Sequence, residues 1–270
     1  MGQAVAVVGF RGYRDSVAAA LDAVGAAAVL GRQRRVLIKP NLVNAAPPPV
    51  TLPVACAEAV VRYVRDCSAA EVLVGEGPGQ VGLSGLDALH VHGYGALARR
   101  YAVTLVDLDA AELKRLENPL CSVFPELWLP RVVLESFVVS VPVLKAHSLA
   151  GVTLSMKNML GCAPAAHYRR GDAWNKAAFH ARMGVSVFEL NRYRKPDLAL
   201  VDASVGLAEF HLGGPTCDPP VNRILAGFDP VAVDAAGATL LGIDWRRVEH
   251  IRLADGVLGT APQGVRAVGG

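Results

Sequence analysis

Short apolar runs that are rich in β-branched residues alternate along the chain with longer, alanine-rich segments of helical period. Several of the apolar runs are continuous rather than alternating, which is typical of strands that helices cover on both faces. The runs predict strands at Ala4–Val8, Val36–Ile38, Glu71–Val74, Val103–Leu108, Phe137–Val141, Asp197–Val201 and Asn222–Ala226.

The alanine-rich segments predict helices, and three of their ends carry recognisable signals. Thr51 is a candidate N-cap, and Asp229 directly before Pro230 is a clearer one. Gly242 is a plausible stop for the last of these helices. The predicted helices are Arg14–Val29, Leu52–Cys67, Gly93–Arg100, Val152–Leu160, His180–Tyr193 and Pro230–Leu241.

This alternation of strands and helices predicts an α/β fold with a mixed, mostly parallel sheet and helices on both faces. The stretch between Pro125 and Pro130 is irregular, and an edge ribbon is one interpretation of it. No internal repeat is visible, and no segment divides the chain as a linker would. We therefore expect residues 1–270 to form a single α/β domain.

The composition fits a large core and no membrane span. Hydrophobic residues make up 52% of the chain and charged residues 19%. The longest apolar runs, such as Val54–Val61, are interrupted well before the ~20 residues that a membrane span needs. No basic segment precedes the first apolar run, so a secretory signal is not expected. These features favour a cytoplasmic protein.

Charge and cysteine content exclude several other classes. The net charge of +3 is mild, and the basic residues are dispersed without an aromatic stripe, so nucleic acid is not an expected partner. The cysteines show no CxxC or similar spacing, which argues against a disulfide framework, a zinc site and an iron–sulfur cluster. We expect no metal and no tightly bound organic cofactor, and the sequence leaves a homo-oligomer open. The five cysteines are Cys56, Cys67, Cys121, Cys162 and Cys217.

Polar residues stand at the ends of two predicted strands, where ligands bind in this architecture. Lys39 ends one strand and is followed by Pro40 and Asn41, which offers both a donor and an acceptor. A lysine that extends to solvent from the strand end is an equally good interpretation. Glu76 lies between two glycines just beyond the next strand, where a buried carboxylate needs a partner.

The strongest candidate segment runs from Lys145 to Asn158. Lys145 and His147 are two residues apart at the end of an apolar strand, so they share a face. Thr153 and Lys157 have the spacing that places two side chains on one face of a helix. Lysines embedded in apolar sequence are unfavourable unless they meet an anion, so a ligand site is favoured over a salt-bridged core.

Other titratable residues carry weaker signals. Asp202 ends a strand and either orients a histidine, balances a lysine or caps a turn. Asp234 lies inside an apolar helix, where it is expected to contact another buried polar group. His167, His180 and His211 lie in polar loops or at helix starts, and no metal-ligand spacing connects them.

Taken in order, these segments resemble a known family. The Lys-x-His and Thr-Leu-x-x-Lys-Asn pieces are specific when they occur together. The matching pieces are Ile38–Leu42, Gly75–Gly77, Lys145–His147, Gly151–Gly161, Asp202–Ala203, Gly214–Pro215 and Gly227–Asp234. The chain is similar to the family catalogued as domain of unknown function 362. Many of its relatives are described as iron–sulfur proteins with ferredoxin-type cysteine clusters, which this chain does not have. The middle residue of the usual Lys-Thr-His is also Ala146 here.

The leading hypothesis is an enzyme that acts on a small anionic molecule, a carboxylate or a phosphate, by isomerisation, epimerisation or elimination. Lysines would neutralise substrate charge, His147 would be the acid–base group, and a carboxylate would orient it or act as the opposing base. The predicted catalytic residues are Lys145, His147, Lys157, Glu76 and Asp202. The predicted binding residues are Lys39, Asn41, Thr153 and Asn158, the last for an oxyanion. A lysine Schiff base, a non-catalytic accessory subunit of a redox system and a metal-dependent enzyme are the alternatives.

Overall fold

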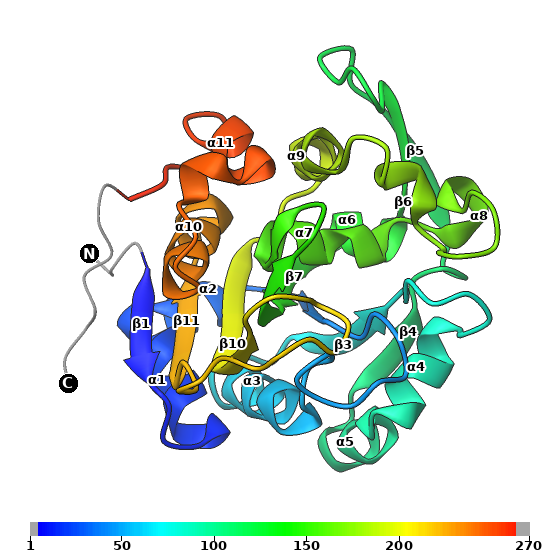
Figure 1. Cartoon of the computed structure of the whole chain (residues 1–270). Coiled ribbons are helices and arrows are strands. Elements are labelled where there is room, and N and C mark those ends of the chain that lie inside the picture. The colour runs from blue at the N-terminus through cyan, green and yellow to red at the C-terminus, as the bar shows by residue number, and fades with distance from the viewer. Residues whose placement is uncertain (1–4, 263–270) are drawn as a thin grey trace.

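A mixed sheet forms the centre of the molecule, and the structure, a computed structural model, describes residues 5–262 (Figure 1). Nine strands of the described residues belong to this sheet, and the main path has the order β1-β11-β10-β7-β2-β3-β4. Strand β8 pairs with β10 and with β9. The strands are β1 (Ala6–Gly9), β2 (Arg35–Pro40), β3 (Glu71–Glu76), β4 (Thr104–Asp107), β7 (Phe137–Val141), β8 (Val143–His147), β9 (Gly151–Thr153), β10 (Leu198–Leu207) and β11 (Arg223–Gly227).

Most neighbouring strands are parallel. The pairs β3–β4, β2–β3, β2–β7, β7–β10 and β8–β10 are parallel, whereas β1–β11, β10–β11 and β8–β9 are antiparallel. The carboxyl ends of β2, β3 and β7 therefore meet at one edge of the sheet.

Helices pack on both faces of this sheet (Figure 1). The helices that follow the first strands along the chain are α1 (Tyr13–Ala23), α2 (Ala26–Leu30), α3 (Val54–Cys67), α4 (Gly85–Val91) and α5 (Tyr94–Tyr101). The later α-helices are α6 (Arg131–Glu135), α7 (Ser155–Asn158), α8 (Ala165–Tyr168), α9 (Met183–Tyr193), α10 (Pro230–Leu240) and α11 (Glu249–Ala254). The 3-10 helices are η1 (Met159–Cys162), η2 (Ala177–Phe179) and η3 (Trp245–Arg247).

The two faces of the sheet bury separate hydrophobic clusters, because successive side chains of a strand point to opposite faces. In β2, Leu37 belongs to the cluster that also contains residues of α7, α9 and α10. Its neighbours Val36 and Ile38 belong to the cluster with residues of α1, α3 and α5. This arrangement explains why the strands appear in the sequence as continuous apolar runs, and it confirms the predicted α/β class.

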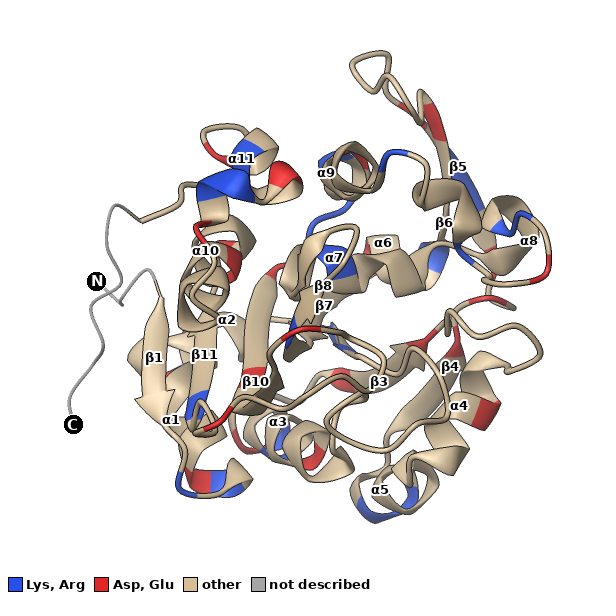
Figure 2. Ribbon diagram, in the orientation of Figure 1, with Lys and Arg blue, Asp and Glu red and all other residues tan. Residues whose placement is uncertain are grey.

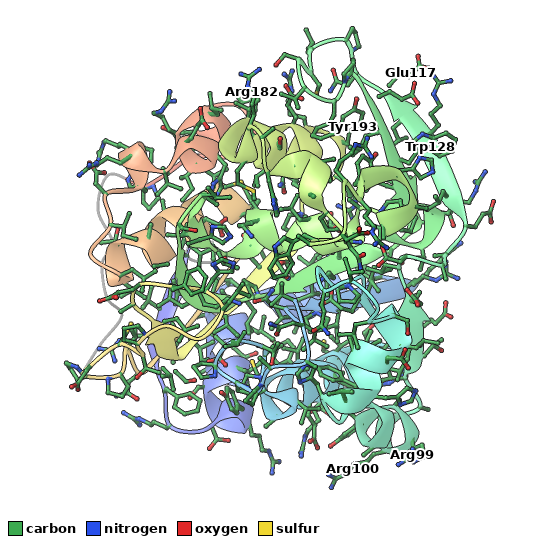
Figure 3. All side chains as sticks on the ribbon, turned by 45° about the vertical axis from the view of Figure 1, so that its right-hand side comes forward. Arg99, Arg100, Glu117, Trp128, Arg182 and Tyr193 are labelled. Atoms are coloured by element: carbon green, nitrogen blue, oxygen red, sulfur yellow. The ribbon has the colours of Figure 1, made fainter. Side chains whose placement is uncertain are left out.

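A two-stranded ribbon lies apart from the main sheet. Strands β5 (Leu113–Glu117) and β6 (Glu126–Pro130) pair with each other, which confirms the ribbon interpretation of the proline-bracketed stretch. Glu117 and Trp128 lie on it, far from Arg99 and Arg100 of α5 (Figure 3). The carboxylate of Glu189 in α9 accepts backbone N–H bonds from residues 122–124, which ties the tip of the ribbon to that helix.

Two local predictions near the N-terminus are wrong. The expected helix Arg14–Val29 is two helices, because Gly25 adopts a left-handed conformation between them. Thr51 does not cap α3, which begins after Pro53; the Thr51 hydroxyl donates to the Ala46 carbonyl instead. The expected strand Ala4–Val8 overlaps β1, and its first residue, Ala4, lies outside the described residues.

The largest error concerns the predicted helix Val152–Leu160. Its first residues form strand β9, which pairs with β8 so that Thr153 lies opposite Lys145. Gly151, at a φ of 77°, lets the chain reverse direction between these strands. The helix begins only at Ser155, so Thr153 and Lys157 do not share a helical face.

No helix within residues 5–262 is both long enough and apolar enough to cross a membrane.

Candidate functional site

A cavity of about 300 Å³ lies at the carboxyl ends of β2 and β3. The β8–β9 hairpin, helix α7 and two loops complete its wall. Figure 2 shows most Lys and Arg residues on the outer elements, whereas the blue on α7 lies near the centre of the view. The polar or charged side chains that line the cavity are Lys39, Asn41, Glu76, His147, Ser148, Thr153, Lys157, Asn158, Lys176, His180 and His211.

Lys39 and Glu76 form a buried ion pair at the floor of this cavity. The Lys39 Nζ lies 2.5 Å from the Glu76 Oε1 and donates to the Pro40 carbonyl. The Glu76 carboxylate also accepts the N–H groups of Leu42 and Gly77. These partners satisfy both side chains, so the pair is electrically neutral and fixed in position. The opposing-base role predicted for Glu76 would require this pair to open.

Glycine at position 161 allows the ion pair to close. A Cβ at Gly161 would lie 2.7 Å from both the Glu76 Oε1 and the Lys39 Nζ, which is closer than real contacts. A Cβ at Gly77 would lie 2.5 Å from the Gly161 carbonyl oxygen. The two backbone segments therefore meet over the pair in a way that only glycine permits.

Lys157 is the cation of this site that has no counter-ion. It lies on α7, is half-buried in the cavity wall, and has no hydrogen-bond or ion-pair partner among residues 5–262. Desolvation lowers the pKa of Lys157 to about 8, so its ammonium is largely retained at neutral pH. An unpaired cation in a desolvated wall favours binding of an anion.

Asp234 of α10 holds the short helix that carries Lys157. Its carboxylate accepts the backbone N–H groups of Ser155 and Met156 and the hydroxyl of Ser155. Burial raises the pKa of Asp234 to about 7, and these hydrogen bonds act in the opposite direction. The predicted buried polar contact of Asp234 is confirmed, and this contact fixes where α7 starts.

His147 is held as a neutral imidazole with a defined tautomer. Its Nδ1 accepts the N–H groups of Leu149 and Ala150, each at 3.1 Å, so the proton resides on Nε2. Burial, and then the charge of Lys157, lower the pKa of His147 to about 2. The pKa near neutrality that the sequence suggested does not hold in this environment. His147 is arranged to donate a hydrogen bond from Nε2.

Two further histidines complete the wall, and sequence reasoning did not place them there. The ring of His211 stacks on that of His147 with centroids 3.7 Å apart. Burial lowers the pKa of His211 to about 3 and also lowers the pKa of His180. Both lie in loops distant from His147 in sequence. The only signal in the sequence was that each of these loops adjoins a buried helix or strand.

Lys145 and Asp202 are not among the residues that line the cavity. Lys145 is buried and donates to the Val50 carbonyl at 2.7 Å, without a carboxylate in ion-pair range among the described residues. Burial, and then the charge of Lys157, lower the pKa of Lys145 to about 7. Asp202 instead accepts the hydroxyl of Tyr13 and the N–H of Ser204.

The other predicted binding residues line the cavity, but one is already engaged. The Asn158 amide donates to the Lys39 carbonyl and to the Ser140 hydroxyl, so no amide proton is left for an oxyanion. Asn41 and Thr153 line the cavity, and the Asn41 Oδ1 and Thr153 Oγ1 are buried without a hydrogen-bond partner. Unpaired buried polar atoms of this kind are uncommon and concentrate where function requires them.

The charges around the cavity leave a positive excess. Lys39 is neutralised by Glu76 and Lys176 by Asp109, so Lys157 remains uncompensated. Within residues 5–262 no group of three or more His, Cys, Asp and Glu side chains is arranged to hold a metal ion. The site is therefore a cavity with one uncompensated ammonium and several imidazoles of lowered pKa, built at the carboxyl edge of an α/β sheet.

Comparison with known proteins gives the family of the chain and a structure of related fold. The model of the family described as Domain of unknown function (DUF362) matches residues 36–239, and the chain belongs to this family. A search of curated proteins found no match. Among solved structures, the chain is similar to the lactate racemase apoprotein from Thermoanaerobacterium thermosaccharolyticum, with a TM-score of 0.56 and 12% identity. The match covers 87% of this chain and 56% of that protein, so the chain spans little more than half its length. This similarity shows a related fold.

Proposed function

We propose that the protein is an enzyme that binds a small monocarboxylate in this cavity and moves a proton on it. The observation that carries the proposal is the unpaired ammonium of Lys157, which faces a cavity lined by three neutral imidazoles. One uncompensated positive charge matches one carboxylate. A phosphate dianion would bring a second negative charge, for which the cavity offers no second free cation among the described residues.

Binding of the anion prepares the histidines for proton transfer. The charge of Lys157 is one of the causes that lower the pKa of His147, His211 and His180. A carboxylate paired with Lys157 offsets that charge, so the pKa values of the imidazoles rise toward the range in which bases act. Substrate binding therefore removes one of the causes that lower the pKa of the base, while burial continues to lower it.

The three imidazoles then have different roles. His147 donates its Nε2 proton in a hydrogen bond to a substrate oxygen, because its Nδ1 is occupied by two amides. His211 or His180 removes the proton from the carbon next to the carboxylate, and the electron pair is delocalised into the carboxylate. Lys157 and His147 stabilise the negative charge that develops there. Epimerisation results when the other of these two imidazoles, in its protonated form, delivers a proton to the opposite face of the carbon. Elimination results when a hydroxyl on the next carbon takes the abstracted proton and leaves as water.

The fold neighbour is compatible with this proposal. That protein is a racemase of lactate, which is a small carboxylate, although only its fold is related to this chain. The assignment of the residues above is based on the geometry of the cavity and not on the neighbour.

The proposal is tested by incubating the protein with small carboxylates in deuterated water and following exchange at the carbon next to the carboxylate by NMR. We expect exchange with the wild type and none with Lys157→Met, which also loses binding in calorimetry. The matched control is Lys114→Met, the same change at an exposed lysine of β5. We expect this variant to keep both the exchange and the binding. Binding without exchange of any carboxylate would refute catalysis and favour a binding protein. Equal binding by the wild type and Lys157→Met would refute the site.

A further inference from the structure

Within residues 5–262, the carboxylate that lines the cavity and the one that contacts a lining lysine are both paired. Glu76 is the carboxylate among the residues that line the cavity, and its Oε1 contacts the Lys39 Nζ. Asp109 is not among the lining residues, and it is paired with Lys176, which is. The remaining polar groups of the lining are a free ammonium, neutral imidazoles, amides and hydroxyls.

This distribution of charges determines which substituent the cavity accepts next to the substrate carboxylate. A hydroxyl next to a carboxylate accepts the hydrogen bond that the His147 Nε2 offers, and it needs no counter-charge. An ammonium in the same place would face the Nε2–H of His147, which is a donor, and would find no unpaired carboxylate among the described residues of the lining. A cation without an anionic partner is unfavourable in a desolvated site.

We propose that the cavity selects hydroxy carboxylates and rejects amino acids of the same carbon skeleton. This inference rests on the proposed function, since it assumes that the substrate carboxylate pairs with Lys157. The inference adds that the substituent next to the carboxylate is a hydroxyl. This follows from the pairing of Glu76 and Asp109 with lysines and from the fixed tautomer of His147.

The remaining lining indicates the kind of skeleton to use in a test. Leu160, Trp174, Phe210 and Leu212 form an apolar part of the wall, which favours an apolar side chain on the ligand. Leucine and its hydroxy acid analogue are therefore a suitable pair, because they share the carboxylate and the branched side chain. They differ only in the group next to the carboxylate, which is an ammonium in leucine and a hydroxyl in the analogue.

Calorimetric titration at neutral pH measures both affinities. We expect the hydroxy acid to bind about 100-fold more tightly than leucine, since an ammonium without a counter-ion costs several kcal/mol at a desolvated site. Equal affinities, or tighter binding of leucine, would overturn the selectivity while the proposed anion site stands. Binding of neither acid by the wild type would overturn the proposed function and the selectivity together.

A second variant supplies the missing carboxylate. Phe210 lies at the cavity rim and is 43% exposed, so Phe210→Asp introduces an anion without opening the core. We expect this variant to narrow the preference for the hydroxy acid by at least about tenfold, since the new carboxylate pairs with the ammonium. Phe210→Asn is the matched uncharged control: it loses the same apolar contact with both ligands, and the ratio of their two affinities stays that of the wild type. An equal narrowing in both variants would overturn the electrostatic origin of the selectivity.

Discussion

Replacement of Lys145 by methionine is expected to stabilise the protein at neutral pH. The sequence suggested two roles for this residue, a contact with a ligand or a salt bridge with a buried carboxylate. In the structure Lys145 is not among the residues that line the cavity, and it has no carboxylate in ion-pair range within residues 5–262. Its buried ammonium donates to the Val50 carbonyl. A buried charge without a counter-ion destabilises the folded state, and methionine keeps most of the volume without the charge.

The magnitude follows from the pKa of Lys145, which burial lowers from 10.5 to about 7. At 1.36 kcal/mol per pKa unit, this difference corresponds to about 5 kcal/mol of destabilisation at pH 7. Methionine removes that contribution but leaves the Val50 carbonyl without its donor, at a cost of about 1–3 kcal/mol. The variant should therefore be more stable by at least about 2 kcal/mol at pH 7.

The same reasoning also predicts how the stability difference between Lys145→Met and the wild type changes with pH. Between about pH 7 and 10.5 the unfolded chain binds more protons at Lys145 than the folded chain does, so wild-type stability rises with pH over this window. The advantage of Lys145→Met should shrink over the same window and reverse near its upper end. Urea unfolding of both proteins at several pH values measures this difference. A variant that is less stable at pH 7 would refute the reasoning and indicate an anionic partner for Lys145.

The remaining predictions concern other buried groups. Glu76→Gln should lower stability by about 3–5 kcal/mol in thermal or urea unfolding, because Lys39 loses its counter-ion; a change below about 1 kcal/mol would contradict the buried pair. Asp234→Asn should weaken carboxylate binding and lower the melting temperature, since Ser155 and α7 lose the carboxylate that fixes the helix start; unchanged calorimetric affinity would exclude this positioning role. His250 is buried with both ring nitrogens unpartnered, and burial lowers its pKa to about 3, so wild-type stability falls as the pH drops below about 6.5 toward 3. His250→Leu should reduce this acid sensitivity, and an equal loss of urea midpoint between pH 7 and pH 5 in both proteins would contradict it.

Much of the fold could be predicted because its signals are local. The buried strands are continuous apolar runs, and Asp229 before Pro230 caps α10 as the sequence indicated, through N–H groups of Val231 and Ala232. The β8–β9 hairpin was missed because the segment Val152–Leu160 has helical spacing of apolar residues. Its strand is imposed by pairing with β8, which is a tertiary effect.

The site was predictable where a residue lies at a strand end. Lys39, Glu76 and His147 lie in the cavity because the carboxyl ends of their strands are close together. His180 and His211 could not be assigned, because loop conformation brings them to His147 and their spacing in sequence carries no signal. The engagement of Asn158 and the lack of a counter-ion for Lys145 depend on partners distant in sequence.

The close contact at Gly161 has a consequence for engineering this protein toward other ligands. Any side chain at position 161 would require the Lys39–Glu76 pair to shift, so variants at this position are expected to lose stability along with the pair. The rim has no such restriction, since Leu149 is 59% exposed and contacts the same cavity as Phe210. Directed evolution of ligand preference should therefore keep the floor constant and randomise the rim, where new side chains reach the ligand without disturbing the ion pair.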